Sequence, residues 1–128
     1  MYRAFDGVVV EGKHLGRTLG FPTINIELLE GPLPGRGVYA ARAWLEGSEA
    51  PAACMLNIGT HPTAPEGPPT IEGHLLGVHG DYYGRRVRVE PIRYLRAERR
   101  FASLEALKEQ LARDAGQVEA CLSEGGHP

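Results

Sequence analysis

Glycine and proline divide the first hundred residues of the chain into short pieces, and this constrains the fold more than any other feature. The 128 residues include 17 glycines and 10 prolines, most of them before residue 100. Such spacing favours an all-β domain with turns over a helical bundle. Six strands are predicted, over residues 3–10, 23–28, 37–45, 51–58, 70–76 and 86–95. Six strands in a small domain are best closed into a barrel, because closure removes exposed edges.

The hydrophobic period indicates where strands give way to a helix. Residues 86–90 alternate polar and apolar side chains as a half-buried strand does, and Pro91 after them indicates a bulge or an edge position. Beyond residue 100 the spacing of apolar residues changes to three and four, and Ser103 is a favourable N-cap. One helix is therefore predicted over about residues 103–123, with an apolar stripe of Leu104, Leu107, Leu111, Ala115, Val118 and Leu122.

Size and composition indicate one cytoplasmic domain. A chain of 128 residues fits a single domain, 1–128, with the barrel over about residues 2–96. No apolar run approaches the length of a membrane span and no apolar segment follows Met1, so neither a membrane helix nor a secretory signal is expected. Cys54 and Cys121 lack a CxxC or histidine-rich setting, which favours two unpaired thiols and no zinc site.

Charge is distributed unevenly along the chain. The net charge is −2, which argues against a general polyanion binder. Residues 85–100, however, contain seven arginines against two glutamates, a local charge of +5. This run is compatible with a solvated strand face, with a site for an anionic group, and with a barrel that binds single-stranded nucleic acid. The acidic net charge and an aromatic content of 7% argue against the nucleic-acid alternative.

A glycine-rich loop precedes two oxygen-bearing side chains. The loop from Gly12 to Gly20 carries Arg17, and such a loop can bring backbone N–H groups and a positive charge to phosphate oxygens, although it lacks the P-loop pattern. Thr23 and Asn25 are two apart, so on a strand both face the same side. A hydroxyl and an amide oxygen side by side suit Mg²⁺. The same pair more commonly hydrogen-bonds to its own backbone.

The predicted strand over residues 70–76 carries a candidate general base. Glu72 and His74 share one face of the strand, and Ile71 and Leu75 share the other. A carboxylate beside a histidine can serve as a base in proton transfer. The alternative is a solvent-facing pair on the barrel exterior.

Arginines and aromatic side chains are interleaved between Tyr94 and Phe101. Arg96 and Arg99 lie in this run, and cations among aromatic rings can hold a flat ligand and its phosphate. A charged loop between the last strand and the helix is the plainer alternative.

Five motifs of the chain together resemble the signatures of riboflavin kinases. GRTLGFPTIN at residues 16–25 resembles GR-x-LGFPTxN, and LPGRGVYA at 33–40 resembles LPxxGVYA. NIGTHPT at 57–63 resembles NIGxxPT, and residues 72–84, from EGH to DYYG, resemble ExHxxx…DLYG. LRAERRFASLEAL at 95–107 resembles LRxExxFxSLExL. The motifs match in order and spacing from about residue 7 to residue 114.

The resemblance implies a six-stranded antiparallel Greek-key β-barrel with a C-terminal α-helix. It also implies an ATP:riboflavin 5′-phosphotransferase, an enzyme that moves the γ-phosphate of ATP, with Mg²⁺, onto riboflavin to give FMN and ADP. The implied catalytic base is Glu72, and the implied metal ligands are Thr23 and Asn25. The implied ATP-binding residues are Gly12, Arg17, Thr23, Asn25, Leu75 and Tyr83, and the implied flavin-binding residues are Arg96, Arg99 and Phe101.

Two questions stay open on the sequence. A flavin- or nucleotide-binding barrel without turnover is the alternative to the kinase, and intact Thr23, Asn25 and Glu72 argue against it. Bacterial members of the family are usually fused to an N-terminal FMN adenylyltransferase domain, so a stand-alone kinase and an excised half are both open. The expected partners are the small molecules riboflavin and ATP, with no nucleic acid and no membrane.

Overall fold

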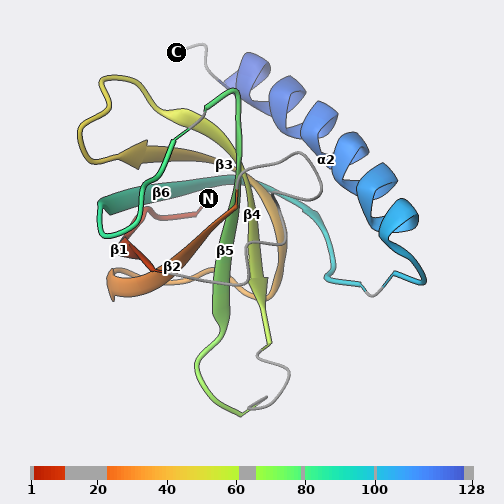
Figure 1. Cartoon of the computed structure of the whole chain (residues 1–128), viewed down its shortest axis with the longest axis horizontal. Coiled ribbons are helices and arrows are strands. Elements are labelled where there is room, and N and C mark those ends of the chain that lie inside the picture. Colours follow the sequence, from red (N-terminus) through yellow and green to blue (C-terminus); the bar gives the residue numbers. More distant parts are fainter. Residues whose placement is uncertain (1, 11–22, 61–65, 79, 100, 126–128) are drawn as a thin grey trace.

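In the part of the chain that the structure describes, six strands close into a barrel and one helix lies along its outside (Figure 1). The computed structural model describes residues 2–10, 23–60, 66–78, 80–99 and 101–125. The elements are β1 (Phe5–Val10), β2 (Thr23–Glu30), β3 (Gly37–Leu45), β4 (Ala52–Gly59), β5 (Thr70–Leu76), β6 (Arg86–Arg96) and α2 (Leu104–Gly125). Each predicted strand, and the predicted helix, begins and ends within two residues of these bounds.

The strand order around the barrel is β1-β2-β5-β4-β3-β6, and every neighbouring pair is antiparallel. The consecutive strands β3, β4 and β5 form a meander, and β6 returns to lie beside β3, which is Greek-key topology. The predicted fold class is therefore confirmed. This order also makes neighbours of β2 and β5, which are far apart in the sequence, and so places Asn25 opposite Glu72.

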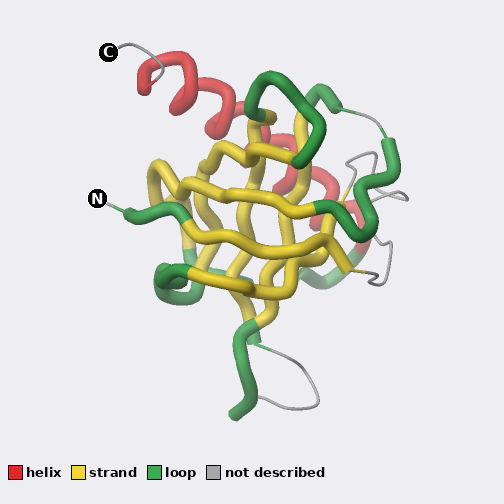
Figure 2. The backbone as a smooth tube through the Cα atoms, turned by 90° about the vertical axis from the view of Figure 1, so that its left-hand side faces the viewer, coloured by secondary structure: helices red, strands yellow, loops and turns green. Residues whose placement is uncertain are grey.

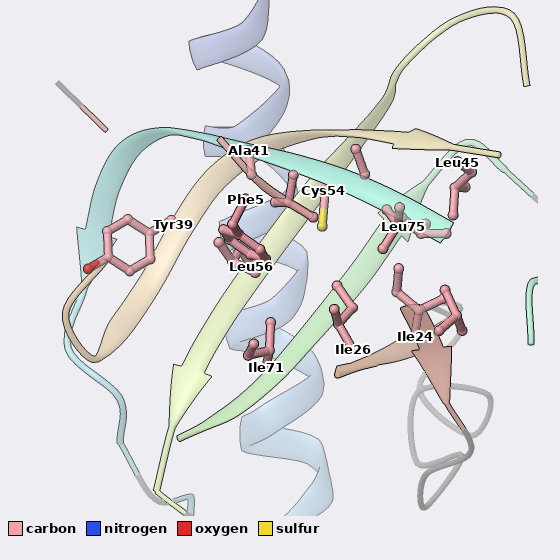
Figure 3. Close-up of a cluster of buried hydrophobic side chains, with 14 of the residues drawn as sticks. Phe5, Ile24, Ile26, Tyr39, Ala41, Leu45, Cys54, Leu56, Ile71 and Leu75 are labelled. Carbon is pink, nitrogen blue, oxygen red and sulfur yellow. The ribbon is translucent and has the colours of Figure 1, made fainter. Parts of the chain in front are cut away.

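Alternate strand residues fill the inside of the barrel (Figure 3). Phe5, Leu56 and Val89 are fully buried there, as expected for side chains of period two on a strand. Gly73 of β5 also faces inward, where an added Cβ would lie 2.9 Å from Cys54 Sγ and 3.3 Å from Ile24 Cγ1. The absence of a side chain at Gly73 therefore lets β5 approach the core closely while its other face carries Glu72 and its neighbours outward.

The bulge predicted at Pro91 is present. Ala41 of β3 pairs with Pro91 and Ala40 pairs with Arg93, so Ile92 has no partner and the register shifts by one residue. An edge position, the other possibility, does not arise because β6 pairs with both β1 and β3.

Helix α2 covers the outer face of the sheet on the side of β3, β4 and β6 (Figures 1 and 2). Leu111, Val118 and Cys121 pack against Met55 and Ala40. The predicted cap is present, because the Ala106 backbone N–H donates to Ser103 Oγ at 3.1 Å. Leu104 does not belong to the packed stripe and is 57% exposed, because it is the first helical residue and the packed face begins one turn later at Leu107.

Both cysteines are buried free thiols, as the sequence predicted. Burial raises the pKa of Cys54 to about 12, so the thiol stays protonated and unreactive at neutral pH. In the part of the chain that the structure describes, no helix combines the length and the apolar character needed to cross a membrane.

Candidate active site

Three polar side chains form a row across the outer face of β2, β5 and β4. In the strand register Asn25 pairs with Glu72, and Glu72 pairs with Asn57. Their sequence neighbours Ile24 and Ile58 belong to the barrel core, so the three polar side chains point outward. Directly paired residues of antiparallel strands have Cβ atoms about 4.5–5.5 Å apart. A half-buried carboxylate therefore lies between two carboxamides.

A second row, next to the first, joins Thr23, His74 and Met55 across the same strands. Thr23 Oγ1 lies 3.0 Å from His74 Nδ1, a hydrogen bond between residues 51 apart in the sequence. Burial lowers the pKa of His74, and the carboxylate of Asp114 partly opposes that shift, so the ring is neutral at pH 7. Thr23 is thus bonded to His74 across the sheet, and His74, like Glu72, is half-buried.

Asn57 carries an unsatisfied acceptor beside the candidate base. Among the described residues, its Oδ1 is the one buried side-chain oxygen or nitrogen without a hydrogen-bond partner. Such an atom costs about 1–3 kcal/mol when it stays unpaired. Exceptions of this kind call for a partner such as water or a bound ligand.

An ion pair ties the end of β6 to the helix. Arg96 Nη2 donates to Asp114 Oδ2 at 2.7 Å, and Arg96 Nε donates to Asp114 Oδ1 at 3.1 Å. Gln110 Nε2 donates to the same carboxylate at 2.9 Å. Asp114 is 1% exposed, so its charge is removed from water and compensated by these donors.

The segment that follows β6 gathers the three candidate flavin residues. The guanidinium carbon of Arg99 lies 5.0 Å from the centroid of the Phe101 ring, and that of Arg96 lies 5.8 Å from it. Both distances are within the range of cation–π attraction. The structure therefore brings together Arg96, Arg99 and Phe101, and their contact with a flavin stays a prediction.

Glu98 brings this segment onto the outer face of β4. Gly59 lies two residues beyond Asn57 on that strand, and the Glu98 carboxylate occupies the space where a Cβ on Gly59 would be. Thr70 Oγ1 lies 3.0 Å from the same position. A larger residue at 59 would thus displace Glu98, and the segment after β6 lies next to the polar row that contains Glu72.

Of the other expected site residues that the structure describes, neither Leu75 nor Tyr83 is brought to this row. Leu75 is fully buried inside the barrel (Figure 3) and faces away from Glu72, so the expectation that it lines the nucleotide site is corrected. Tyr83 is 60% exposed in the turn before β6, where its backbone N–H donates to Asp81 Oδ1 at 3.0 Å. Gly12 and Arg17 lie outside the described residues.

Several of the clustered arginines have local partners on the surface. Arg88 Nε donates to Asp6 Oδ1 at 3.1 Å, and the Arg85 guanidinium lies 5.4 Å from the centroid of the Tyr82 ring. Arg86, Arg88 and Arg93 are exposed on β6, as expected for a solvated strand face, whereas Arg96 is engaged by the buried Asp114.

Sequence reasoning missed Asn57, Glu98 and Asp114 as contributors to the site. Asp114 had a readable signal, because Leu107, Leu111, Asp114, Val118 and Cys121 follow one another at helical spacings of four and three. A charged residue in a buried stripe needs a partner. Asn57 had no comparable signal, since its position beside Glu72 follows from the strand register.

Comparison with known proteins agrees with this arrangement of motifs and fold. A family model described as riboflavin kinase matches residues 2–122. The chain belongs to the riboflavin kinase family. It is 47% identical over 111 residues to the bifunctional riboflavin kinase/FMN adenylyltransferase of Escherichia coli (strain K12), covering 87% of this chain and 35% of that protein. The chain thus spans about a third of the length of this relative.

Two solved structures share the fold of this riboflavin kinase family member. A crystal structure of riboflavin kinase from Trypanosoma brucei matches with a TM-score of 0.66 and 25% identity, over 94% of this chain and 79% of that chain. A crystal structure described as a macrolide-efflux protein from Streptococcus pneumoniae matches with a TM-score of 0.82 and 28% identity, over 92% of this chain and 38% of that chain.

Proposed function

We propose that this chain is a riboflavin kinase that transfers the γ-phosphate of ATP to the 5′-hydroxyl of riboflavin, giving FMN and ADP. The observation that carries the proposal is the outward row of Asn25, Glu72 and Asn57, with Thr23 one position along, in a chain of the riboflavin kinase family. A cytoplasmic location belongs to the same proposal. So does an accompanying FMN adenylyltransferase domain, of the kind that the name of the E. coli relative describes.

Thr23 and Asn25 fit the magnesium ion that ATP brings. Among the described residues there is no cluster of three or more His, Cys, Asp or Glu side chains that could hold a metal. Mg²⁺ does not require one, because it usually keeps several waters and binds through one or two protein oxygens together with substrate phosphates. The Thr23 hydroxyl and the Asn25 carbonyl oxygen are hard donors on one strand face and would hold it. When bound, the ion neutralises charge on the phosphates.

Glu72 would act as the base. Its carboxylate accepts the proton of the ribityl 5′-hydroxyl while that oxygen attacks the γ-phosphorus in line. The bond from the γ-phosphorus to the bridging oxygen breaks, and ADP leaves with the electron pair. A positioned base contributes typically about 10²–10⁴-fold to the rate.

The segment after β6 would hold the flavin. Phe101 offers a flat ring for stacking on the isoalloxazine. Arg99 lies beside it, donates to Gln110 Oε1 at 3.5 Å, and offers a positive charge toward polar ring atoms. Because Arg96 is engaged by Asp114, its contribution is to hold Phe101 in place. Tyr83, Gly12 and Arg17 remain proposed nucleotide contacts, and Leu75 is left out of the site.

The first expected result is enzymatic. Incubation of the protein with riboflavin, ATP and Mg²⁺ should convert riboflavin to FMN. Chromatography of the flavins measures the product. Omission of ATP, or addition of EDTA, should abolish the product. A protein that binds riboflavin and ATP yet forms no FMN would be the non-catalytic barrel, and the kinase proposal would be discarded.

A second expectation concerns the metal ligands. Thr23→Ala and Asn25→Ala should each lower kcat/KM for ATP·Mg²⁺ by at least about 10-fold, since even the outer partners of metal ligands contribute 10–100-fold in other proteins. Thermal melts should show that both variants stay folded. Ser48→Ala, in the turn after β3, is the control and should behave as wild type. Unchanged kinetics in both variants would remove the proposed metal site.

A further inference from the structure

We propose that His74 is a positioning residue for the metal site: its Nδ1 accepts the hydrogen of the Thr23 hydroxyl and so directs the oxygen lone pairs toward the cation. The inference rests on the proposed function, because it takes Thr23 as a ligand of the Mg²⁺ that accompanies ATP. Neither the motif spacing nor the family resemblance assigned His74 a role in metal binding.

The hydrogen bond of 3.0 Å between Thr23 Oγ1 and His74 Nδ1 carries the inference. The two residues are directly opposed in the register of β2 and β5, so the pairing of the strands holds them together. A threonine hydroxyl has one hydrogen and two acceptor lone pairs. When the hydroxyl hydrogen is directed at Nδ1, the oxygen presents only lone pairs to any further group. A metal ion binds such lone pairs.

The packing around His74 favours the geometry that this role needs. Nδ1 accepts only when the ring is neutral and its hydrogen is on Nε2. Met55, which pairs with His74 on β4, is 1% exposed and packs under α2. The ring therefore lies in a packed position beside the hydroxyl, an arrangement that commonly orients metal ligands.

Three substitutions separate the acceptor from the rest of the ring. In His74→Asn the amide oxygen can occupy the place of Nδ1 and keep the acceptor. In His74→Gln the longer side chain reaches the place of Nε2 and leaves the Nδ1 position without an acceptor. His74→Leu removes both polar positions and keeps a side chain of similar volume. Thermal melts without ligand establish which variants are folded, and His74→Gln serves if His74→Leu is not.

The measurement is the metal-dependent part of ADP affinity. Calorimetric titration gives the dissociation constant of ADP in the presence of Mg²⁺ and in the presence of EDTA. The ratio of the constant in EDTA to the constant with Mg²⁺ measures how much the metal strengthens ADP binding. His74→Leu and His74→Gln should lower this ratio by about 10-fold, as loss of an outer partner of a metal ligand does, while ADP affinity in EDTA stays unchanged. His74→Asn should lie within about threefold of wild type. Equal ratios in wild type, His74→Leu and His74→Gln would overturn the proposal.

A double-mutant cycle with Thr23→Val tests the route of the effect. If His74 acts through the hydroxyl, His74→Leu should change the ratio less than about twofold in a chain that already carries Thr23→Val. A further tenfold loss in that background would mean that His74 acts independently of Thr23, against the proposal. If Thr23→Val alone leaves the ratio at the wild-type value, the metal site of the proposed function fails. A loss in Thr23→Val with none in His74→Leu overturns only the role of His74.

Discussion

Glu72→Gln is expected to lower kcat by about 100-fold or more, the usual contribution of a general base. Glutamine keeps the size of the side chain and its ability to hydrogen-bond, but it cannot accept the proton of the attacking hydroxyl. A loss of 100-fold corresponds to about 2.7 kcal/mol of activation free energy. Because the effect is confined to the transition state, kcat and kcat/KM should fall together while the affinities for riboflavin and ADP change little.

Steady-state kinetics and a thermal melt on the same preparation decide this prediction. Glu30→Gln is the matched control, since Glu30 is an exposed carboxylate at the end of β2 and should leave turnover at the wild-type value. If Glu72 were a simple surface carboxylate, its variant would keep near-normal turnover and change the free energy of unfolding by less than about 0.5 kcal/mol. Turnover within a few-fold of wild type would exclude Glu72 as the base and favour transfer without a protein base.

The strands could be predicted because the residues that mark them lie within or directly beside each strand. Glycine and proline end the short runs, and alternation within residues 86–90 marks one outer and one inner face. The order of strands around the barrel has no such local signal. The pairing of β2 with β5 joins Thr23 to His74 across 51 residues of sequence, and only the family resemblance indicated a Greek-key barrel.

The same distinction explains which side-chain placements in the candidate site could be predicted. Period two placed Glu72 and His74 on one face and Leu75 on the other, and the structure confirms it. The resemblance nevertheless implied that Leu75 contacts the nucleotide, and there the local rule was the better guide. Asn57 could not be predicted as a neighbour of Glu72, because that contact depends on the register between β4 and β5. A shift of that register by one residue would turn the side chains of one strand to the opposite face.

Asp114→Ala is expected to lower the free energy of unfolding by about 3–5 kcal/mol, because it breaks a buried ion pair. Asp114 accepts hydrogen bonds from Arg96 and Gln110 at a position that is 1% exposed. Its removal leaves the guanidinium of Arg96, whose side chain is only 19% exposed, without its counter-charge. Glu119→Ala removes an exposed acid from the same helix and should change the free energy by less than about 0.5 kcal/mol. Urea unfolding of the three proteins measures the difference.

Replacing both residues separates the contribution of the ion pair to folding stability from its contribution to riboflavin binding. Arg96→Met combined with Asp114→Leu replaces both charged side chains with apolar ones, and such exchanges of a buried ion pair are often neutral or stabilising. The double variant should therefore recover most of the lost stability. It should still bind riboflavin more weakly than wild type, because Arg96 also lies 5.8 Å from the Phe101 ring and helps to hold it. Flavin fluorescence titration measures that affinity. A stable double variant with wild-type riboflavin affinity would limit the ion pair to a structural role and would leave Arg99 and Phe101 as the candidate flavin contacts.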